Sequence, residues 1–163
     1  MKALSLWQPY ASLIACGAKP FETRDRAPSW HLIGKRIAIH AAKRRPTRLG
    51  AMALDNLGVA DALGRADWCD GLPYGVVVCT AVLRGAYRTA SWAHHAGAPV
   101  AVDAVAGPTP PLAAIPTDLW GDYSPGRWCW HLVDVVALDP PVLATGRQGL
   151  FAIDDSLIPE AAR

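Results

Sequence analysis

The sequence predicts an α+β fold, a small mixed β-barrel of about five or six strands with flanking helices. Segments with the apolar or alternating composition of strands recur along the chain, and only one or two segments have a helical period. Strands and helices do not alternate in the βαβ rhythm of a parallel sheet. A length of 163 residues fits one domain over 1–163 with a substantial core. The expected strands are 3–6, 35–41, 75–87, 127–137 and 149–153.

A short helix is expected directly after the first strand. Proline is well tolerated at a first helical position, so Pro9 can begin this helix. Tyr10, Leu13 and Ile14 then share one face, and Gly17 supplies the left-handed residue that often ends a helix. The pattern predicts a two-turn helix with one buried stripe.

A second helix is expected over residues 48–63. Thr47 is a residue type that favours the N-cap position before such a helix. Leu49, Met52 and Leu57 fall near one face, which predicts that this face is buried.

The remaining strands differ in their expected burial. Ile37 and Ile39 alternate with more polar neighbours, which predicts a half-buried strand. The valine-rich segment 75–87 is typical of a strand buried on both faces. Trp128 and Trp130, two residues apart on a later strand, are assigned to the core.

Residues 89–119 are rich in Ala, Gly and Pro and show neither a helical nor a strand period. We interpret them as a long loop inserted within the domain, with one strand near 100–105. Such loops are often functional lids or simply family-specific additions.

Charge is distributed unevenly along the chain although the net charge is only +2. Residues 1–48 contain ten Lys and Arg against two acidic residues, whereas 49–163 contain six against twelve. The first segment can therefore attract phosphate, unless folding interleaves the two halves and neutralises it.

Several other classes of protein and site are disfavoured by the sequence. No apolar segment approaches the roughly 20 residues that span a bilayer, so we expect no membrane association. A lipoprotein-like box ends at Cys16, but Pro9 interrupts the apolar segment before it, and we expect a cytoplasmic protein. The four cysteines form no C-x-x-C pair, and the adjacent His94 and His95 have no ligand at metal-binding spacing. We expect neither a metal nor a cofactor.

One motif links the chain to a known family. Residues 17–24 read Gly-Ala-Lys-Pro-Phe-Glu-Thr-Arg and match the pattern Gly-X-Lys-X-X-Glu-X-Arg. This pattern resembles the signature of the ASCH (activating-signal-cointegrator homology) domain. Further similar segments are 5–11, 34–41, 120–128 and 146–151. The resemblance implies a PUA-like barrel and a role in binding RNA.

The three charged residues of this motif form the candidate site that the resemblance implies. Lys19 is expected just beyond a helix end, and Glu22 and Arg24 point to the same side of an extended segment. The two cations should lower the pKa of the Glu22 carboxyl unless burial opposes them. A structural salt bridge is the alternative interpretation of the same residues.

Aromatic and basic residues around the motif extend the candidate surface. A base stacked on Trp7 or Tyr10 would gain about 1–3 kcal/mol, and Gln8 could bond a base edge, although core packing is the stronger interpretation for either aromatic taken singly. The full set expected to bind nucleic acid is Lys19, Arg24, Trp7, Gln8, Tyr10, Lys43, Arg44 and Arg45.

The leading hypothesis is a module that binds RNA, with single-stranded RNA, a modified nucleotide or DNA as candidate partners. The main alternative is a hydrolase with Lys19, Glu22 and Arg24 as catalytic residues, because some ASCH relatives are amidohydrolases of acetylated cytidine nucleosides and others are described as ribonucleases. In the amidohydrolases a nucleophilic threonine corresponds to Glu22, which argues against that activity here. A ribonuclease could use His40 and Tyr123 with these cations. A protein-interaction adaptor is the third class, and the sequence identifies no protein partner.

Overall fold

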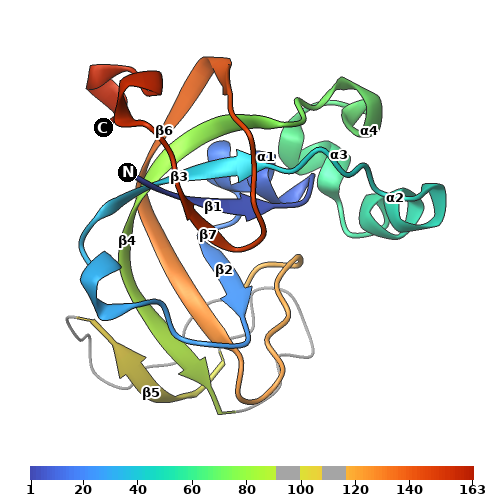
Figure 1. Cartoon of the computed structure of the whole chain (residues 1–163). Helices are drawn as coiled ribbons and strands as arrows, with labels where there is room; N and C mark the ends of the chain where they lie inside the picture. Colours follow the sequence, from blue (N-terminus) through green and yellow to red (C-terminus); the bar gives the residue numbers. More distant parts are fainter. Residues whose placement is uncertain (91–99, 108–116) are drawn as a thin grey trace. The chain divides into compact units, whose positions relative to one another are not determined.

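A computed structural model describes residues 1–90, 100–107 and 117–163 of the chain (Figure 1). The chain divides into two compact units, which we call unit 1 and unit 2. Unit 1 comprises Met1–Ala18, Arg36–Ala81 and Val135–Arg163, and unit 2 comprises Lys19–Lys35 and Val82–Asp134. The expectation of a single domain over 1–163 stays a prediction.

The described part of the chain contains strands, four α-helices and three short 3₁₀ helices (Figure 1). The strands are β1 (Lys2–Leu6), β2 (Phe21–Arg24), β3 (Arg36–Ala41), β4 (Val76–Thr89), β5 (Val102–Ala106), β6 (Trp128–Leu143) and β7 (Leu150–Ala152). The helices are α1 (Tyr10–Ala15), α2 (Arg48–Asp55), α3 (Val59–Leu63), α4 (Trp68–Gly71), η1 (Trp30–Leu32), η2 (Asp155–Leu157) and η3 (Glu160–Ala162).

The seven described strands form one mixed sheet, which confirms the expected α+β combination of a mixed sheet with helices. Hydrogen bonds give the order β2-β6-β4-β3-β1-β7, with β5 paired to β4. β1 runs parallel to β3 and antiparallel to β7, and β2 runs antiparallel to β6. These hydrogen bonds do not close the sheet between the described strands, so the predicted barrel is not confirmed.

In unit 1, β3 is buried more completely than its sequence predicts. Ala38 and His40 are buried as well as Ile37 and Ile39, so the half-buried assignment was wrong. Apolar groups cover both faces: Ala38 packs in a cluster with the C-terminal Ile158, and α1 contacts β3. An alternating pattern of apolar and polar residues predicts burial of one face only. It does not show that another segment of the chain also covers the second face.

The first helix agrees with the prediction in its buried stripe. Leu13 and Ile14 are fully buried in α1, and Gly17 follows the helix with a φ of 81°. Pro9 is the N-cap residue rather than the first helical residue, and Tyr10 is only half-buried.

The single helix predicted for residues 48–63 is wrong. α2 ends at Asp55 with Asn56 as its C-cap, and Gly58, with a left-handed φ of 73°, is the N-cap of α3. Thr47 does cap α2, since its Oγ1 accepts a hydrogen bond from the Gly50 amide at 3.1 Å. The predicted apolar face is not buried, because Leu49 is 79% exposed and Met52 is also exposed.

In unit 2, the core gathers around β2 and the first half of β6. Its cluster is formed by Phe21, Tyr87, Val100, Tyr123 and Cys129. Trp130 is buried as predicted, and its Nε1 donates to the carbonyl oxygen of Arg26 at 3.0 Å. Trp128 is only half-buried, so its assignment to the core holds in part.

Two of the four cysteines, Cys79 and Cys129, fit the expectation of buried thiols, whereas Cys16 is exposed and Cys69 is half-buried. Cys79 and Cys129 are fully buried, and burial raises the pKa of each thiol to about 12. All four cysteines are free.

Two further expectations concern features outside the core. Across residues 1–90, 100–107 and 117–163, no helix is long and apolar enough to cross a membrane, and no three His, Cys, Asp or Glu gather as metal ligands. His94, His95 and most of the 89–119 loop lie outside the described residues, but β5 confirms the strand expected near 100–105.

Candidate nucleic-acid interface

The candidate site residues fall into two groups, one in each unit. Lys19, Glu22 and Arg24 belong to unit 2. The aromatic and basic residues expected beside them belong to unit 1, namely Trp7, Gln8, Tyr10, Lys43, Arg44 and Arg45. Each group is described separately below.

In unit 2, Lys19 is a buried cation held by a buried carboxylate. Its side chain is almost fully buried, and its Nζ lies 3.5 Å from Oδ1 of Asp118, which is itself largely buried. The Tyr123 hydroxyl donates to the other carboxylate oxygen of Asp118 at 2.8 Å. Burial and the nearby Asp118 charge raise the pKa of Tyr123, so this hydroxyl stays protonated. Most of the charge of Lys19 is therefore compensated within the protein.

Glu22 is the second buried charge of the motif. Its Oε1 lies 3.7 Å from Nη1 of Arg24. Burial raises the pKa of the carboxyl, and this effect exceeds the lowering by Lys19 and Arg24, so the exception stated with the prediction, that burial opposes the cations, applies. The cause is desolvation, which disfavours the ionised form. Glu22 therefore retains a proton more readily than an exposed glutamate.

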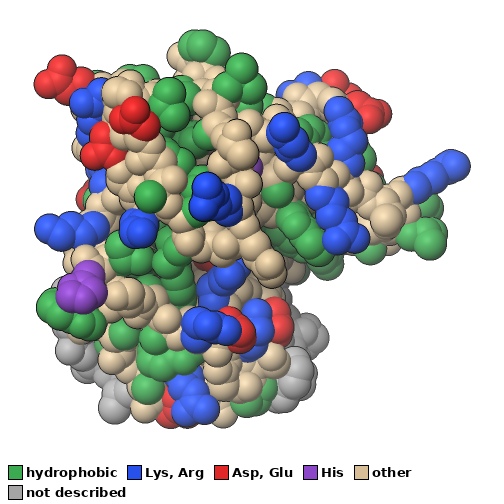
Figure 2. All heavy atoms as spheres, viewed as in Figure 1, with side chains coloured by type: hydrophobic (Ala, Val, Ile, Leu, Met, Phe, Trp, Pro, Cys, Tyr) green, Lys and Arg blue, Asp and Glu red, His purple; other side chains and the backbone are tan. Residues whose placement is uncertain are grey.

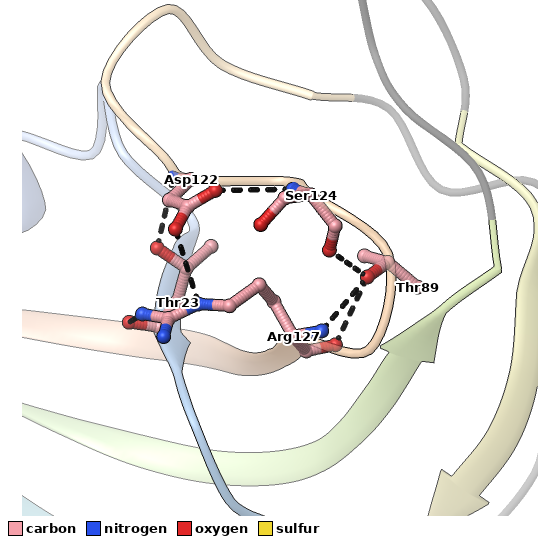
Figure 3. A network of polar contacts seen from close by, with 5 residues as sticks. All are labelled: Thr23, Thr89, Asp122, Ser124 and Arg127. Atoms are coloured by element: carbon pink, nitrogen blue, oxygen red, sulfur yellow. Dashed lines mark hydrogen bonds and ion pairs between the residues drawn. The ribbon is translucent and has the colours of Figure 1, made fainter.

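Thr23, on the other side of β2, holds the segment before β6 (Figure 3). Its hydroxyl accepts a hydrogen bond from the Asp122 amide at 3.0 Å, and its carbonyl oxygen accepts one from Nη2 of Arg127 at 3.4 Å. Arg127 and Asp122 form an ion pair at 3.3 Å. The Thr89 hydroxyl donates to the carbonyl oxygen of Ser124 at 2.5 Å and fixes the same turn to β4. The hydroxyl and the carbonyl oxygen of Thr23 are therefore both engaged in hydrogen bonds within unit 2.

Asp118 is the residue of this cluster that the sequence analysis missed. It lies in the segment interpreted as a featureless loop, almost a hundred residues from Lys19. Neither spacing nor local composition marks an isolated aspartate as the partner of a distant lysine. A buried cation needs a carboxylate partner, but nothing in the sequence showed that Lys19 would be buried.

In unit 1, Trp7 and the basic residues after β3 are exposed. Trp7 is 55% exposed, and the Arg44 guanidinium carbon lies 4.5 Å from the centroid of its ring. Lys43 and Arg44 have no ion pair among the described residues, whereas Arg45 lies 3.5 Å from Asp70. Figure 2 shows Lys and Arg side chains gathered over the part of the chain that carries α2 to α4. We call Trp7, Lys43, Arg44 and Arg45 the Trp7 surface.

Gln8 does not extend this surface as expected, whereas Tyr10 is half-buried. Gln8 is buried, and its Nε2 donates to Ser12 Oγ at 2.8 Å and to the Pro73 carbonyl oxygen at 2.9 Å. Its Oε1 accepts from the Ser12 amide at 3.1 Å. The amide of Gln8 is satisfied inside the fold and is not available to a base edge.

The residues weighed for a ribonuclease are divided between the units. His40 lies in unit 1, whereas Lys19, Arg24 and Tyr123 lie in unit 2. The ring of His40 is buried between Ser5 Oγ, 3.0 Å from Nδ1, and the Ala144 carbonyl oxygen, 3.2 Å from Nε2. Burial lowers the pKa of His40, which favours the neutral ring.

Comparison with protein families agrees with the motif found in the sequence. The family model described as ASCH domain matches residues 4–142, which is most of the chain. No curated protein matches the sequence in the same kind of comparison. The match extends through β1 to nearly the end of β6 and includes strands from both units. The chain belongs to the ASCH domain family.

Proposed function

We propose that this protein binds single-stranded RNA through the Trp7 surface of unit 1. The observation that carries the proposal is the exposed Trp7 ring with the Arg44 guanidinium against it. Membership of the ASCH domain family supports RNA binding at a coarse level.

The chemistry of this surface suits a nucleotide chain. An exposed indole is a stacking platform for a base, and stacking contributes about 1–3 kcal/mol per base. Arg44 is held near the ring by a cation–π contact and can pair a phosphate bidentately, while Lys43 adds an exposed charge. Base stacking and phosphate pairing do not distinguish ribose from deoxyribose, so we expect single-stranded DNA to bind as well.

The charged residues of the motif have a different part in this proposal. Lys19 and Glu22 are buried among their partners, so we assign them to positioning the segment that contains β2. Arg24 is partly exposed, and we keep it as a proposed phosphate contact of unit 2.

Two further properties accompany the proposal. We infer that the sheet curls into a PUA-like barrel, which family membership supports. We also propose that the protein works in a reducing compartment such as the cytoplasm, because its cysteines are free and two are deeply buried.

A hydrolase acting on nucleic acid or on a modified nucleoside is the second candidate function. One observation favours it: the raised pKa of Glu22 beside two cations resembles the tuning of a general acid. The leading proposal expects no hydrolysis of acetylated cytidine or of unstructured RNA. Turnover by the wild type that is lost in Glu22→Gln would establish the hydrolase instead.

The binding proposal is tested with a labelled, unstructured RNA oligomer and fluorescence anisotropy. Trp7→Ala should weaken binding about 5- to 150-fold, the range that corresponds to one stacked base. Trp30→Ala is the matched control, because Trp30 is also highly exposed but lies in unit 2. Equal affinities for wild type and Trp7→Ala would refute the proposed surface.

A further inference from the structure

A pocket of ≈ 360 Å³ opens in unit 1 at the end of β6. Its lining comes from four separate segments of the chain: the one after β3, the one before β4, the end of β6 with its following turn, and η2. The lining residues are Lys43, Gly75, Leu143, Ala144, Thr145 and Leu157. The volume lies within the range of about 300–1,000 Å³ typical of small-molecule sites.

One wall of the pocket depends on a close approach between Lys43 and Gly75. A Cβ atom added to Gly75 would lie 2.9 Å from Cγ and 3.0 Å from Cε of Lys43. Gly75 also has a left-handed φ of 70°, which a side chain would strain. The aliphatic stem of Lys43 therefore runs against bare backbone.

A second wall of the pocket is the turn after β6, and His40 holds this turn in place. Nε2 of His40 lies 3.2 Å from the Ala144 carbonyl oxygen, and the Ala144 amide lies 3.4 Å from the Gly75 carbonyl oxygen. A Cβ added to Gly146 would lie 2.2 Å from Cε1 of the His40 ring. The turn thus packs directly on the ring, so both walls are fixed before any ligand arrives.

The lining combines a cation with exposed apolar surface. Lys43 has no ion pair within the described residues, and Thr145 contributes an exposed hydroxyl. Leu143 is 80% exposed and Leu157 is 45% exposed, although both are large apolar residues. An anion-binding end beside an uncovered apolar end fits a ligand that carries both kinds of group.

We propose that this pocket binds a phosphate monoester attached to a nucleoside, with the phosphate at Lys43 and Thr145 and the base against Leu143 and Leu157. An ammonium group and a hydroxyl are both hydrogen-bond donors to phosphate oxygens. A nucleobase offers a flat apolar face to the leucines. The phosphate can come from a free nucleotide or from the phosphorylated end of a chain.

This site goes beyond the Trp7 surface, although Lys43 belongs to both. Thr145, Leu143 and Leu157 have no part in the proposed stacking of bases on Trp7. Trp7→Ala should therefore weaken binding of an RNA oligomer and leave mononucleotide binding unchanged. The two proposals can fail independently of each other.

The test is calorimetric titration of the purified full chain with uridine 5′-monophosphate, uridine and inorganic phosphate. We expect saturable binding of the monophosphate, at least tenfold tighter than that of uridine or of phosphate alone. Thr145→Val and Lys43→Ala should each weaken it about tenfold, since each removes a bond to a charged group. Lys35→Ala in unit 2 is the control and should change nothing.

Three results would overturn the proposal. They are the absence of saturable binding, equal binding of uridine or of inorganic phosphate, and unchanged affinity in both pocket variants with intact thermal unfolding. A second arm compares a short RNA with and without a 5′-phosphate. A preference for the phosphorylated RNA over the mononucleotide identifies a chain end as the source, and the reverse preference identifies a free nucleotide.

Discussion

Two regions of this molecule contain charged residues that differ in their burial. The motif in unit 2 holds Lys19 and Glu22 in the interior, where Asp118 and Arg24 face them. The Trp7 surface in unit 1 holds Lys43 and Arg44 in solvent. Charge in the interior is committed to a partner in the fold, whereas charge in solvent is available to a ligand. Burial and pairing, more than residue type, separate a structural ion pair from a binding surface.

The largest effect is expected from breaking the buried pair of unit 2. Lys19→Met removes the cation and leaves the Asp118 carboxylate buried without compensation, which typically costs about 3–5 kcal/mol of stability. Urea unfolding should show this loss as a lower midpoint. Lys43→Met is the matched control, because Lys43 is exposed, and it should leave the free energy of unfolding nearly unchanged.

A double variant distinguishes the effect of losing the ion pair from a general loss of packing in the core. Lys19→Met combined with Asp118→Leu replaces both charges by apolar groups and should recover much of the lost stability. If Lys19→Met alone were as stable as the wild type, the charge of Lys19 would not contribute to the stability of the fold.

The dependence of stability on pH should have opposite signs for two buried groups, His40 in unit 1 and Glu22 in unit 2. The folded state lowers the pKa of His40 from 6.5, so its contribution is present above that pH and is lost as pH falls below it. The folded state raises the pKa of Glu22 from 4.5, so ionisation of Glu22 disfavours folding above that pH and protonation relieves the penalty.

Urea unfolding between about pH 4 and pH 8 tests these signs. His40→Gln should reduce the loss of stability on acidification, and Glu22→Gln should remove the opposing gain. If both variants kept the wild-type pH profile, the titration of these two buried groups would not control stability.

The sequence predicted the strands better than the helices, for a physical reason. Strand segments such as 75–87 carry their burial in local composition, which the structure confirms over Val76–Ala81. The helix over 48–63 failed because apolar spacing alone did not reveal that Gly58 would turn left-handed. Local periodicity cannot show whether another segment covers a face, and Leu49 is 79% exposed.

The candidate site was predictable in its members and not in its arrangement. The motif Gly-X-Lys-X-X-Glu-X-Arg identified the family, and the basic residues 43–45 were recognised as an exposed patch. The raised pKa of Glu22 and the pairing of Lys19 with Asp118 depend on burial by distant segments. Those contacts have no counterpart in the spacing of residues along the chain.

A smaller effect is expected from the salt dependence of RNA binding. Each phosphate contact on a single strand contributes about 0.7 to the slope of log affinity against log salt concentration. Arg44→Ala should lower that slope by about this amount, and Arg45→Ala by less, because Arg45 already lies near Asp70. Anisotropy titrations at several salt concentrations measure both slopes, and equal slopes for Arg44→Ala and the wild type would remove Arg44 from the phosphate contacts.

The most direct test of the account measures RNA affinity and unfolding free energy together for Trp7→Ala and Lys19→Met. We predict that Trp7→Ala loses about 5- to 150-fold in affinity for an unstructured RNA at unchanged stability. Lys19→Met should lose stability while the fraction that remains folded binds RNA almost as the wild type does. The opposite result, in which Lys19→Met abolishes binding by folded protein and Trp7→Ala binds normally, would contradict the account and return the binding site to the motif in unit 2.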